Sequence, residues 1–258
     1  MSAAPQIKPR PVREQVSAEE WAIRVDLAAM YRLVAHYGWD DMVFTHISAR
    51  VPGPEHHFLI NPYGLLFDEI TASSLVKIDT EGNKVMESPY PVNAAGFTIH
   101  SALHMSREDA NSVIHLHTDD GVAVASQEHG LLPLSQHGMM VLDDLAYHDY
   151  EGIALDLDER ERLIKDMGAK NFMILRNHGT LTVGKSCADA FLRMYYLERA
   201  CTMQVRALAG GSTPNRANQG VEKKTAEQGK VAFDGFVGAI SWPALLRMLD
   251  KRDPSYRA

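Results

Sequence analysis

The chain has 258 residues, of which 45% are apolar, 23% charged and 8% aromatic. These proportions are typical of a folded globular protein and exclude a chain that is disordered as a whole. The formal net charge is −7, so no overall positive field is available to attract phosphate backbones or anionic lipids. We therefore expect a small-molecule substrate, with neither nucleic acid nor membrane as a partner.

The two cysteines, Cys187 and Cys201, are too few for a disulfide framework and form no C-x-x-C metal pattern. Residues 1–16 contain three prolines among charges and lack the apolar run of a signal peptide. No window approaches the roughly eighteen apolar residues of a membrane span. We expect reduced thiols, a flexible arm over residues 1–16 and a cytoplasmic protein.

The first half of the chain alternates helical and strand-like patterns. A capping box at Ser17 and a stop at Gly38 delimit a predicted helix. Short apolar runs broken by turns predict strands between Asp41 and Met86. Helical spacing returns over Ala94–Ser106, and the following SVIHLH predicts a strand that ends in two histidines.

The middle of the chain is predicted to continue with a helix over Asp119–Ser126. The segment LLPLSQHGMMVL, residues 131–142, is predicted to be a strand region, and residues 147–150 a polar stretch. A further helix is expected over Asp158–Met167.

Two short strands around Asn177-His178-Gly179 and a long helix over Cys187–Leu208 complete the predicted domain, residues 17–210. Residues 211–258 are expected to be a mobile polar segment, rich in turn formers, followed by one short amphipathic helix.

Three histidines form the strongest candidate site. His115 and His117 are two apart on one predicted strand and so point to the same face, which lets a strand present two imidazoles to one metal ion. His178, in a tight turn between strands, is free to join them as a third ligand. The alternative is that the two imidazoles of the H-x-H pair satisfy each other or the backbone.

Other polar residues nearby have two interpretations each. Asp119 and Asp120 could accept hydrogen bonds from a ligand imidazole and orient it, or they could cap the next helix. His100 and His104 share a helix face and could approach the metal, or they could simply pack. The polar residues 147–151 could line a substrate or contact a subunit.

The sequence resembles the class II aldolase and adducin head-domain superfamily. The resemblance is carried by NPYGLLFDEITASSLVKID, SREDANSVIHLHTDDGVAVAS and LRNHGTLTVGKSCADAF, in this order, and it runs from about Trp21 to Leu208. It implies a single three-layer α/β domain, with a central, mostly antiparallel sheet flanked by helices. It also implies a homo-oligomer, most simply a homotetramer with active sites at subunit boundaries.

The resemblance further implies a divalent metal held by His115, His117 and His178, with zinc favoured over manganese or iron. In the family's sugar-phosphate aldolases and epimerases, this ion polarises the substrate and stabilises the enediolate left after carbon–carbon cleavage. His137 falls where these aldolases place a proton-donating tyrosine from a neighbouring subunit. A surface histidine without chemistry is the alternative for His137.

Two motifs depart from the family pattern. Where the family has two serines and an acidic residue, this sequence has Ala94-Ala95-Gly96. Where the family has a phosphate-binding Gly-Asn, it has Thr45-His46. A dianionic phosphate would lose donors worth roughly 1–3 kcal/mol each, which argues against a sugar phosphate as substrate. The resemblance places the substrate beside five residues, His46, Asn61, Tyr63, Gly64 and Gly96.

Three functions are consistent with these residues. The first is a metal-dependent carbon–carbon lyase that cleaves or decarboxylates a small, non-phosphorylated hydroxy or keto acid through a metal-stabilised enolate. The second is an adducin-like assembly module without catalysis, which the missing acidic residue favours. The third is an iron oxygenase on the same fold, because three histidines do not exclude oxygen chemistry.

Overall fold

The computed structural model describes residues 10–92, 94–152, 158–211 and 213–258. At its centre is a seven-stranded sheet in the order β3-β2-β1-β4-β7-β6-β5. Only the pair of β5 and β6 is parallel, and the other neighbours run antiparallel. The strands are β1 (His46–Arg50), β2 (Phe58–Ile60), β3 (Val76–Ile78), β4 (Ser112–Leu116), β5 (Leu145–His148), β6 (Phe172–Leu175) and β7 (Gly179–Gly184).

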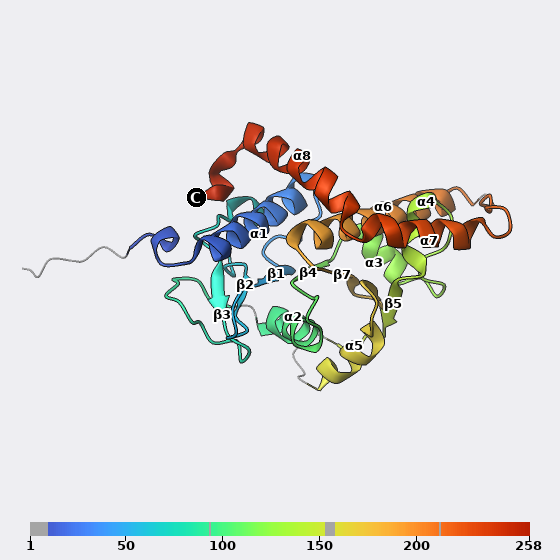
Figure 1. The fold of residues 1–258 in the computed structure, drawn as a ribbon. Coiled ribbons are helices and arrows are strands. Elements are labelled where there is room, and N and C mark those ends of the chain that lie inside the picture. The colour runs from blue at the N-terminus through green and yellow to red at the C-terminus, as the bar shows by residue number, and fades with distance from the viewer. Residues whose placement is uncertain (1–9, 93, 153–157, 212) are drawn as a thin grey trace, which may run out of the picture.

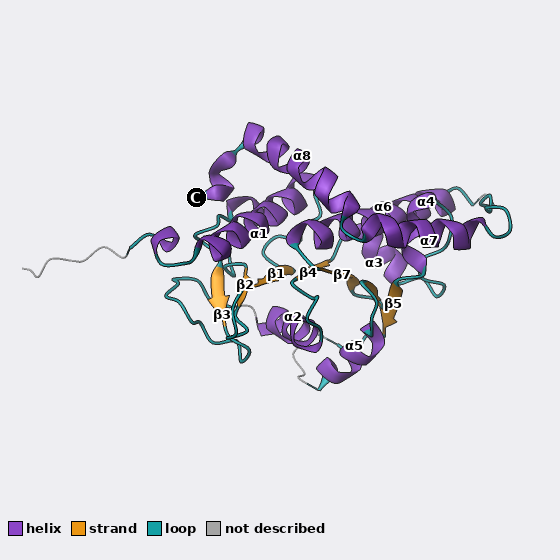
Figure 2. Ribbon diagram, viewed as in Figure 1, coloured by secondary structure: helices purple, strands orange, loops and turns teal. Residues whose placement is uncertain are grey.

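Helices cover both faces of this sheet, which gives the three layers that the family resemblance implies (Figures 1 and 2). The helices are α1 (Ala18–Tyr37), α2 (Ala94–Ser106), α3 (Asp119–Ala125), α4 (Gln136–Leu142), α5 (Glu159–Met167), α6 (Cys187–Ala209), α7 (Val221–Phe233) and α8 (Phe236–Arg252). Short 3-10 turns are η1 (Val12–Glu14), η2 (Phe67–Glu69) and η3 (Pro254–Arg257). Helices α1, α6 and α8 lie over one face, and α2 and α5 over the other (Figure 1).

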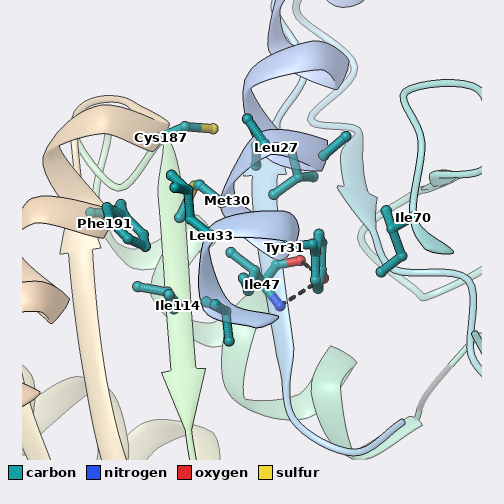
Figure 3. Close-up of a cluster of buried hydrophobic side chains, with 14 of the residues drawn as sticks. Leu27, Met30, Tyr31, Leu33, Ile47, Ile70, Ile114, Cys187 and Phe191 are labelled. Atoms are coloured by element: carbon teal, nitrogen blue, oxygen red, sulfur yellow. Dashed lines mark hydrogen bonds between the residues drawn. The ribbon is translucent and has the colours of Figure 1, made fainter. Parts of the chain in front are cut away.

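The alternation of side chains along β4 explains why both faces are apolar. Ile114 packs with Leu33 and Phe191 in the core beneath α1 and α6, as Figure 3 shows. Val113, its neighbour in sequence, belongs to the second core beneath α2 and α5. A central strand buried on both faces positions its residues with little freedom.

The helix ends follow the predicted capping signals. The Ser17 side chain accepts a hydrogen bond from the Glu20 amide, and Gly38 ends α1 in a left-handed conformation at φ 66°. Ser186 caps α6 in the same way, through the Asp189 amide. Cys187 and Cys201 on α6 are buried and free, as predicted.

Two segments of the middle region differ from the predictions. Residues 136–142, predicted as strand, form α4, because the Ser135 side chain caps a helix by accepting from the Gly138 amide. Residues 147 and 148 were expected in a polar stretch and instead belong to β5, which pairs with β6 along its whole length. Pairing between strands distant in sequence decides such short segments.

The C-terminal part also differs. Residues 221–233, expected within a mobile segment, form α7, which packs against α4. The last helix begins at Phe236 and is therefore longer than predicted. Residues 1–9 of the expected arm lie outside the described residues, and the division of the chain into arm, domain and C-terminal segment stays a prediction. Among the described helices, none has the length and apolar character needed to traverse a bilayer.

A left-handed residue immediately precedes β1. Thr45 has φ 64°, although a β-branched side chain disfavours this conformation. Its side chain is buried, and its hydroxyl has no hydrogen-bond partner in the described part of the chain. The strained residue thus lies directly before His46, the first residue of β1.

The contact between α7 and α4 can be tested at Gly229. A Cβ at this position would lie 2.5 Å from the Met140 carbonyl oxygen, so Gly229→Ala forces the helices apart. We expect a loss of about 1–3 kcal/mol in the free energy of unfolding, measured by urea denaturation. Gly210→Ala is the control, since no atom lies within 4 Å of the added Cβ. Equal stability of the two variants would contradict the packing of α7.

The strain at Thr45 can be tested by comparing two substitutions there. Thr45→Gly and Thr45→Ala both remove the buried hydroxyl, but only glycine adopts a positive φ without steric cost. We expect the glycine variant to be more stable than the alanine variant by about 1 kcal/mol in urea denaturation. An alanine variant at least as stable as the glycine variant would show that residue 45 carries no strain.

Candidate functional site

Three histidines meet at one end of β4 and β7. His115 lies on β4, His117 follows it, and His178 lies in the turn between β6 and β7. One ring nitrogen from each lies within 4.8 Å of those of the others. The ring centroids of His115 and His178 are 4.7 Å apart, and those of His117 and His178 are 4.8 Å apart. The structure thus brings together the three residues that the sequence singled out.

The turn that carries His178 depends on the residues on either side of it. Asn177 has φ 56°, a left-handed conformation that asparagine tolerates better than most residues. A Cβ on Gly179 would lie 2.3 Å from the Leu116 carbonyl oxygen and 3.2 Å from His117 Cδ2. Only glycine at position 179 therefore lets this turn approach the H-x-H pair closely.

Hydrogen bonds fix which nitrogen of each imidazole carries the proton. His115 Nδ1 lies 2.9 Å from the Thr180 carbonyl oxygen, and His117 Nδ1 lies 3.2 Å from Asp41 Oδ2. Because both partners accept, both Nδ1 atoms are donors, and in the neutral form of each ring Nε2 carries the lone pair. These two Nε2 atoms face each other at 2.9 Å. Two opposed lone pairs repel, and a cation between them removes the repulsion, so this donor set fits a metal ion.

Burial keeps His115 and His178 neutral. It lowers the pKa of His115 well below its ordinary value and, with the neighbouring His117, that of His178 to about 4. Neutral imidazoles retain the lone pairs that a metal requires. The site is therefore ready to bind a cation at neutral pH without first losing protons from these two groups.

The carboxylate that orients the triad is Asp41, which the sequence did not indicate. It lies 76 residues before His117 in the chain, and no local motif marks it. Asp119 and Asp120, the residues considered for this role, lie in the first turn of α3, where Asp120 accepts from the Thr202 hydroxyl at 2.6 Å. The cap of α3 is Thr118, whose side chain accepts from the Gly121 amide, so the two aspartates follow the cap, and their role toward a metal ligand stays a proposal.

His46 is the predicted substrate residue with a described contact to the triad. It pairs with His115 across β1 and β4, and their ring centroids are 5.4 Å apart. Burial lowers the pKa of His46 to about 3, so its ring is neutral. Neither ring nitrogen has a hydrogen-bond partner in the described part of the chain.

The other predicted substrate residues lie in two places. Asn61 follows β2, where its side-chain oxygen accepts from the Tyr31 hydroxyl at 3.2 Å. Tyr63 and Gly64 lie in the next turn, in which the Tyr63 amide donates to the Pro91 carbonyl. Gly96 lies in the first turn of α2. Their role toward a substrate stays a proposal.

His100 and His104 on α2 share a face and both bond to Ser48 on β1, at 2.6 Å each. The His100 ring also lies 4.3 Å from that of His46, between centroids. These two histidines thus form a buried group next to His46. The helical spacing predicted that they share a face, but it did not predict their contacts with Ser48 and His46.

The predicted proton donor His137 lies on a different element from the three histidines. It lies on α4, half-buried, and its ring stacks on Tyr196 of α6 at 4.8 Å. The described residues show no contact between His137 and the triad, and its role as an acid or base stays a proposal. Tyr150, in the polar stretch, is 6.1 Å from His178 between centroids and half-exposed, so this stretch borders the triad.

A polar cavity of about 490 Å³ opens beside His117. Asp41, Tyr195, Glu198 and Arg199 are among its lining residues. Glu198 is buried and accepts from the hydroxyls of two threonines, and burial raises its pKa to about 7. The cavity therefore gives a small polar molecule a route to the edge of the triad.

The family model for the class II aldolase and adducin N-terminal domain matches residues 25–205. A crystal structure of an aldolase II superfamily protein from Pseudomonas syringae covers 96% of this chain and 99% of its own at 50% identity, with a TM-score of 0.93. The L-fuculose 1-phosphate aldolase from Glaciozyma antarctica is 25% identical, with 98% and 97% covered and a TM-score of 0.80.

Curated relatives agree with this result. A Caulobacter vibrioides protein named "Putative aldolase class 2 protein" is 58% identical over 95% of each chain. Alpha-adducin of Mus musculus is 42% identical over 90% of this chain, which spans only 33% of that longer protein. The chain therefore belongs to the class II aldolase and adducin N-terminal domain family.

Proposed function

We propose that this protein is a divalent-metal-dependent carbon–carbon lyase. The observation that carries the proposal is the pair of opposed Nε2 lone pairs of His115 and His117, with His178 beside them. His115, His117 and His178 would hold the ion, and zinc suits three imidazoles best among the metals considered. When bound, such an ion acts as a Lewis acid toward a carbonyl or hydroxyl oxygen.

The surrounding residues orient the ligands. The Thr180 carbonyl and the Asp41 carboxylate hold the His115 and His117 rings so that Nε2 of each faces the same point. Such partners increase the basicity of the ligand nitrogen and fix the ring. The cavity beside His117 would then admit a small substrate.

The proposed substrate is a small, non-phosphorylated hydroxy or keto acid. Ala94-Ala95-Gly96 offers neither hydroxyls nor a carboxylate, and Thr45-His46 replaces a phosphate-binding motif of the family. A buried neutral His46 supplies no positive charge for a dianion. These departures support a less charged substrate than that of the sugar-phosphate aldolases.

Proton transfer and assembly form the next part of the proposal. His137 would act as acid or base from a neighbouring subunit of a homotetramer, because within its own chain it packs on Tyr196. Asp119 and Asp120 would then serve only the start of α3, and Asp41 would support the metal ligands.

The second candidate is an adducin-like assembly module. The similarity to alpha-adducin and the glycine at position 96 favour it. The third candidate, an oxygenase, uses the same histidines with iron. Metal identity and metal dependence separate the three.

The metal site is tested by elemental analysis and zinc titration of the full chain. We expect about one zinc per chain, lost in a His115→Ala, His117→Ala double variant. Asp41→Asn should weaken zinc binding about 10–100-fold, whereas the exposed Asp40→Asn should not. Equal affinities in the two aspartate variants would refute the role of Asp41, and no zinc uptake after reconstitution would favour the assembly module.

The lyase activity is tested by incubating zinc-loaded protein with short hydroxy and keto acids and following cleavage products by NMR. We expect turnover of a non-phosphorylated acid and at least a hundredfold loss in the double variant, since the Lewis acid is then absent. Turnover of L-fuculose 1-phosphate in preference to every acid would contradict the proposed substrate class. Activity only with iron and oxygen would identify an oxygenase.

A further inference from the structure

His46 and His100 leave three ring nitrogens without partners next to the triad. They are Nδ1 and Nε2 of His46 and Nε2 of His100, and no described residue bonds to them. His46 is 4% exposed and His100 2% exposed, so bulk water does not replace the missing partners. A buried polar atom without a partner costs about 1–3 kcal/mol, so such a group calls for a ligand or an ordered water.

The protonation of His100 follows from a chain of hydrogen bonds. His104 Nδ1 lies 2.6 Å from the Ala110 carbonyl oxygen, so it donates and His104 Nε2 accepts. The Ser48 hydroxyl, 2.6 Å from that Nε2, therefore donates to it. Ser48 Oγ then accepts from His100 Nδ1 at 2.6 Å, which leaves His100 Nε2 as a bare acceptor.

The group that would bind here must donate a hydrogen bond. A neutral His46 offers one donor and one acceptor, and His100 Nε2 adds a second acceptor. Carboxylate and phosphate oxygens only accept, so they leave the bare His100 Nε2 without a donor. Arg50, a cation that contacts this network, donates instead to the backbone carbonyls of His104 and Arg107. A hydroxyl group can donate its one proton to His100 Nε2 and accept from the protonated nitrogen of His46, so it satisfies two of the three nitrogens.

The position of the pair connects it to the triad. His46 is the register partner of His115, and its ring lies 4.3 Å from that of His100 and 5.4 Å from that of His115, between centroids. The pair is therefore adjacent to the triad.

We propose that His46 and His100 form a subsite for a hydroxyl group of the molecule bound at the triad, in which this hydroxyl donates to His100 Nε2. Ser48 and His104 are positioning residues that hold His100 in the accepting tautomer. This inference rests on the proposed function for the ligand at the triad, and it adds that the substrate carries a neutral hydroxyl beyond its metal-binding oxygens.

Calorimetry on zinc-loaded full-length protein tests the subsite with D-lactate, D-glycerate and D-3-phosphoglycerate. Lactate and glycerate share the hydroxy-acid group and differ in one hydroxyl. We expect glycerate to bind about tenfold tighter than lactate, and 3-phosphoglycerate to bind more weakly than glycerate. Equal affinities of lactate and glycerate, no binding of either, or a preference for the phosphorylated acid would overturn the subsite.

Ser48→Ala frees His100 to take the other tautomer. Glycerate and lactate should then bind with about equal affinity. Ser112→Ala is the matched control, because the hydroxyl of this buried serine bonds the Ser48 backbone carbonyl and the Met30 sulfur and has no described bond to His100 or His104. It should keep the tenfold preference. A preference that persists in Ser48→Ala, or falls equally in Ser112→Ala, would contradict the positioning role.

The tautomer itself is measured on metal-free wild-type protein by NMR with ¹⁵N-labelled histidine, with the His100 signals assigned through His100→Gln. We expect a protonated Nδ1 and a bare Nε2 at neutral pH. A protonated Nε2 would overturn the subsite even if zinc binds as proposed. Failure to load zinc, with the expected tautomer present, would refute the proposed function and leave the direction of the network intact.

Discussion

The antiparallel pairing of β4 with β1 on one side and β7 on the other is the constraint on which the site depends. It places His46 opposite His115 and Leu116 opposite Thr180. It also brings the turn before β7 to the end of β4, where His178 meets the H-x-H pair. Because β4 is buried on both faces, a shift of register by one residue would turn His115 toward α1 and dismantle the site.

The second constraint is electrostatic. Imidazoles buried together cannot all be charged, so burial and mutual repulsion keep His46, His100 and His115 neutral. Neutral rings have one donor and one acceptor each, and backbone carbonyls at Thr180 and Ala110 decide which nitrogen is which. The Nε2 lone pair of His115 therefore points into the triad, and that of His100 is left free beside His46. The same physics thus supports both the proposed metal ligands and the proposed hydroxyl subsite.

Several elements could be predicted because local signals and tertiary packing agree. The caps at Ser17 and Ser186 and the turn at residues 177–179 are encoded by a few adjacent side chains. The prediction for α4 was wrong because the short apolar run Met139–Leu142 fits a strand or a helix equally well, and the serine cap was overlooked. Helix α7 was not predicted because its sequence is mostly polar. No local pattern indicated that Gly229 would let it lie against α4.

The sequence by itself determined the family and the three metal-ligating candidates, since each is written in residue types at short spacing. Only the tertiary structure decided that Asp41 orients His117, and that Ser48 and His104 set the tautomer of His100. The physical reason is the range of the interactions. A turn or an H-x-H pair acts over a few residues, whereas a hydrogen bond across the sheet joins side chains whose separation in sequence carries no pattern.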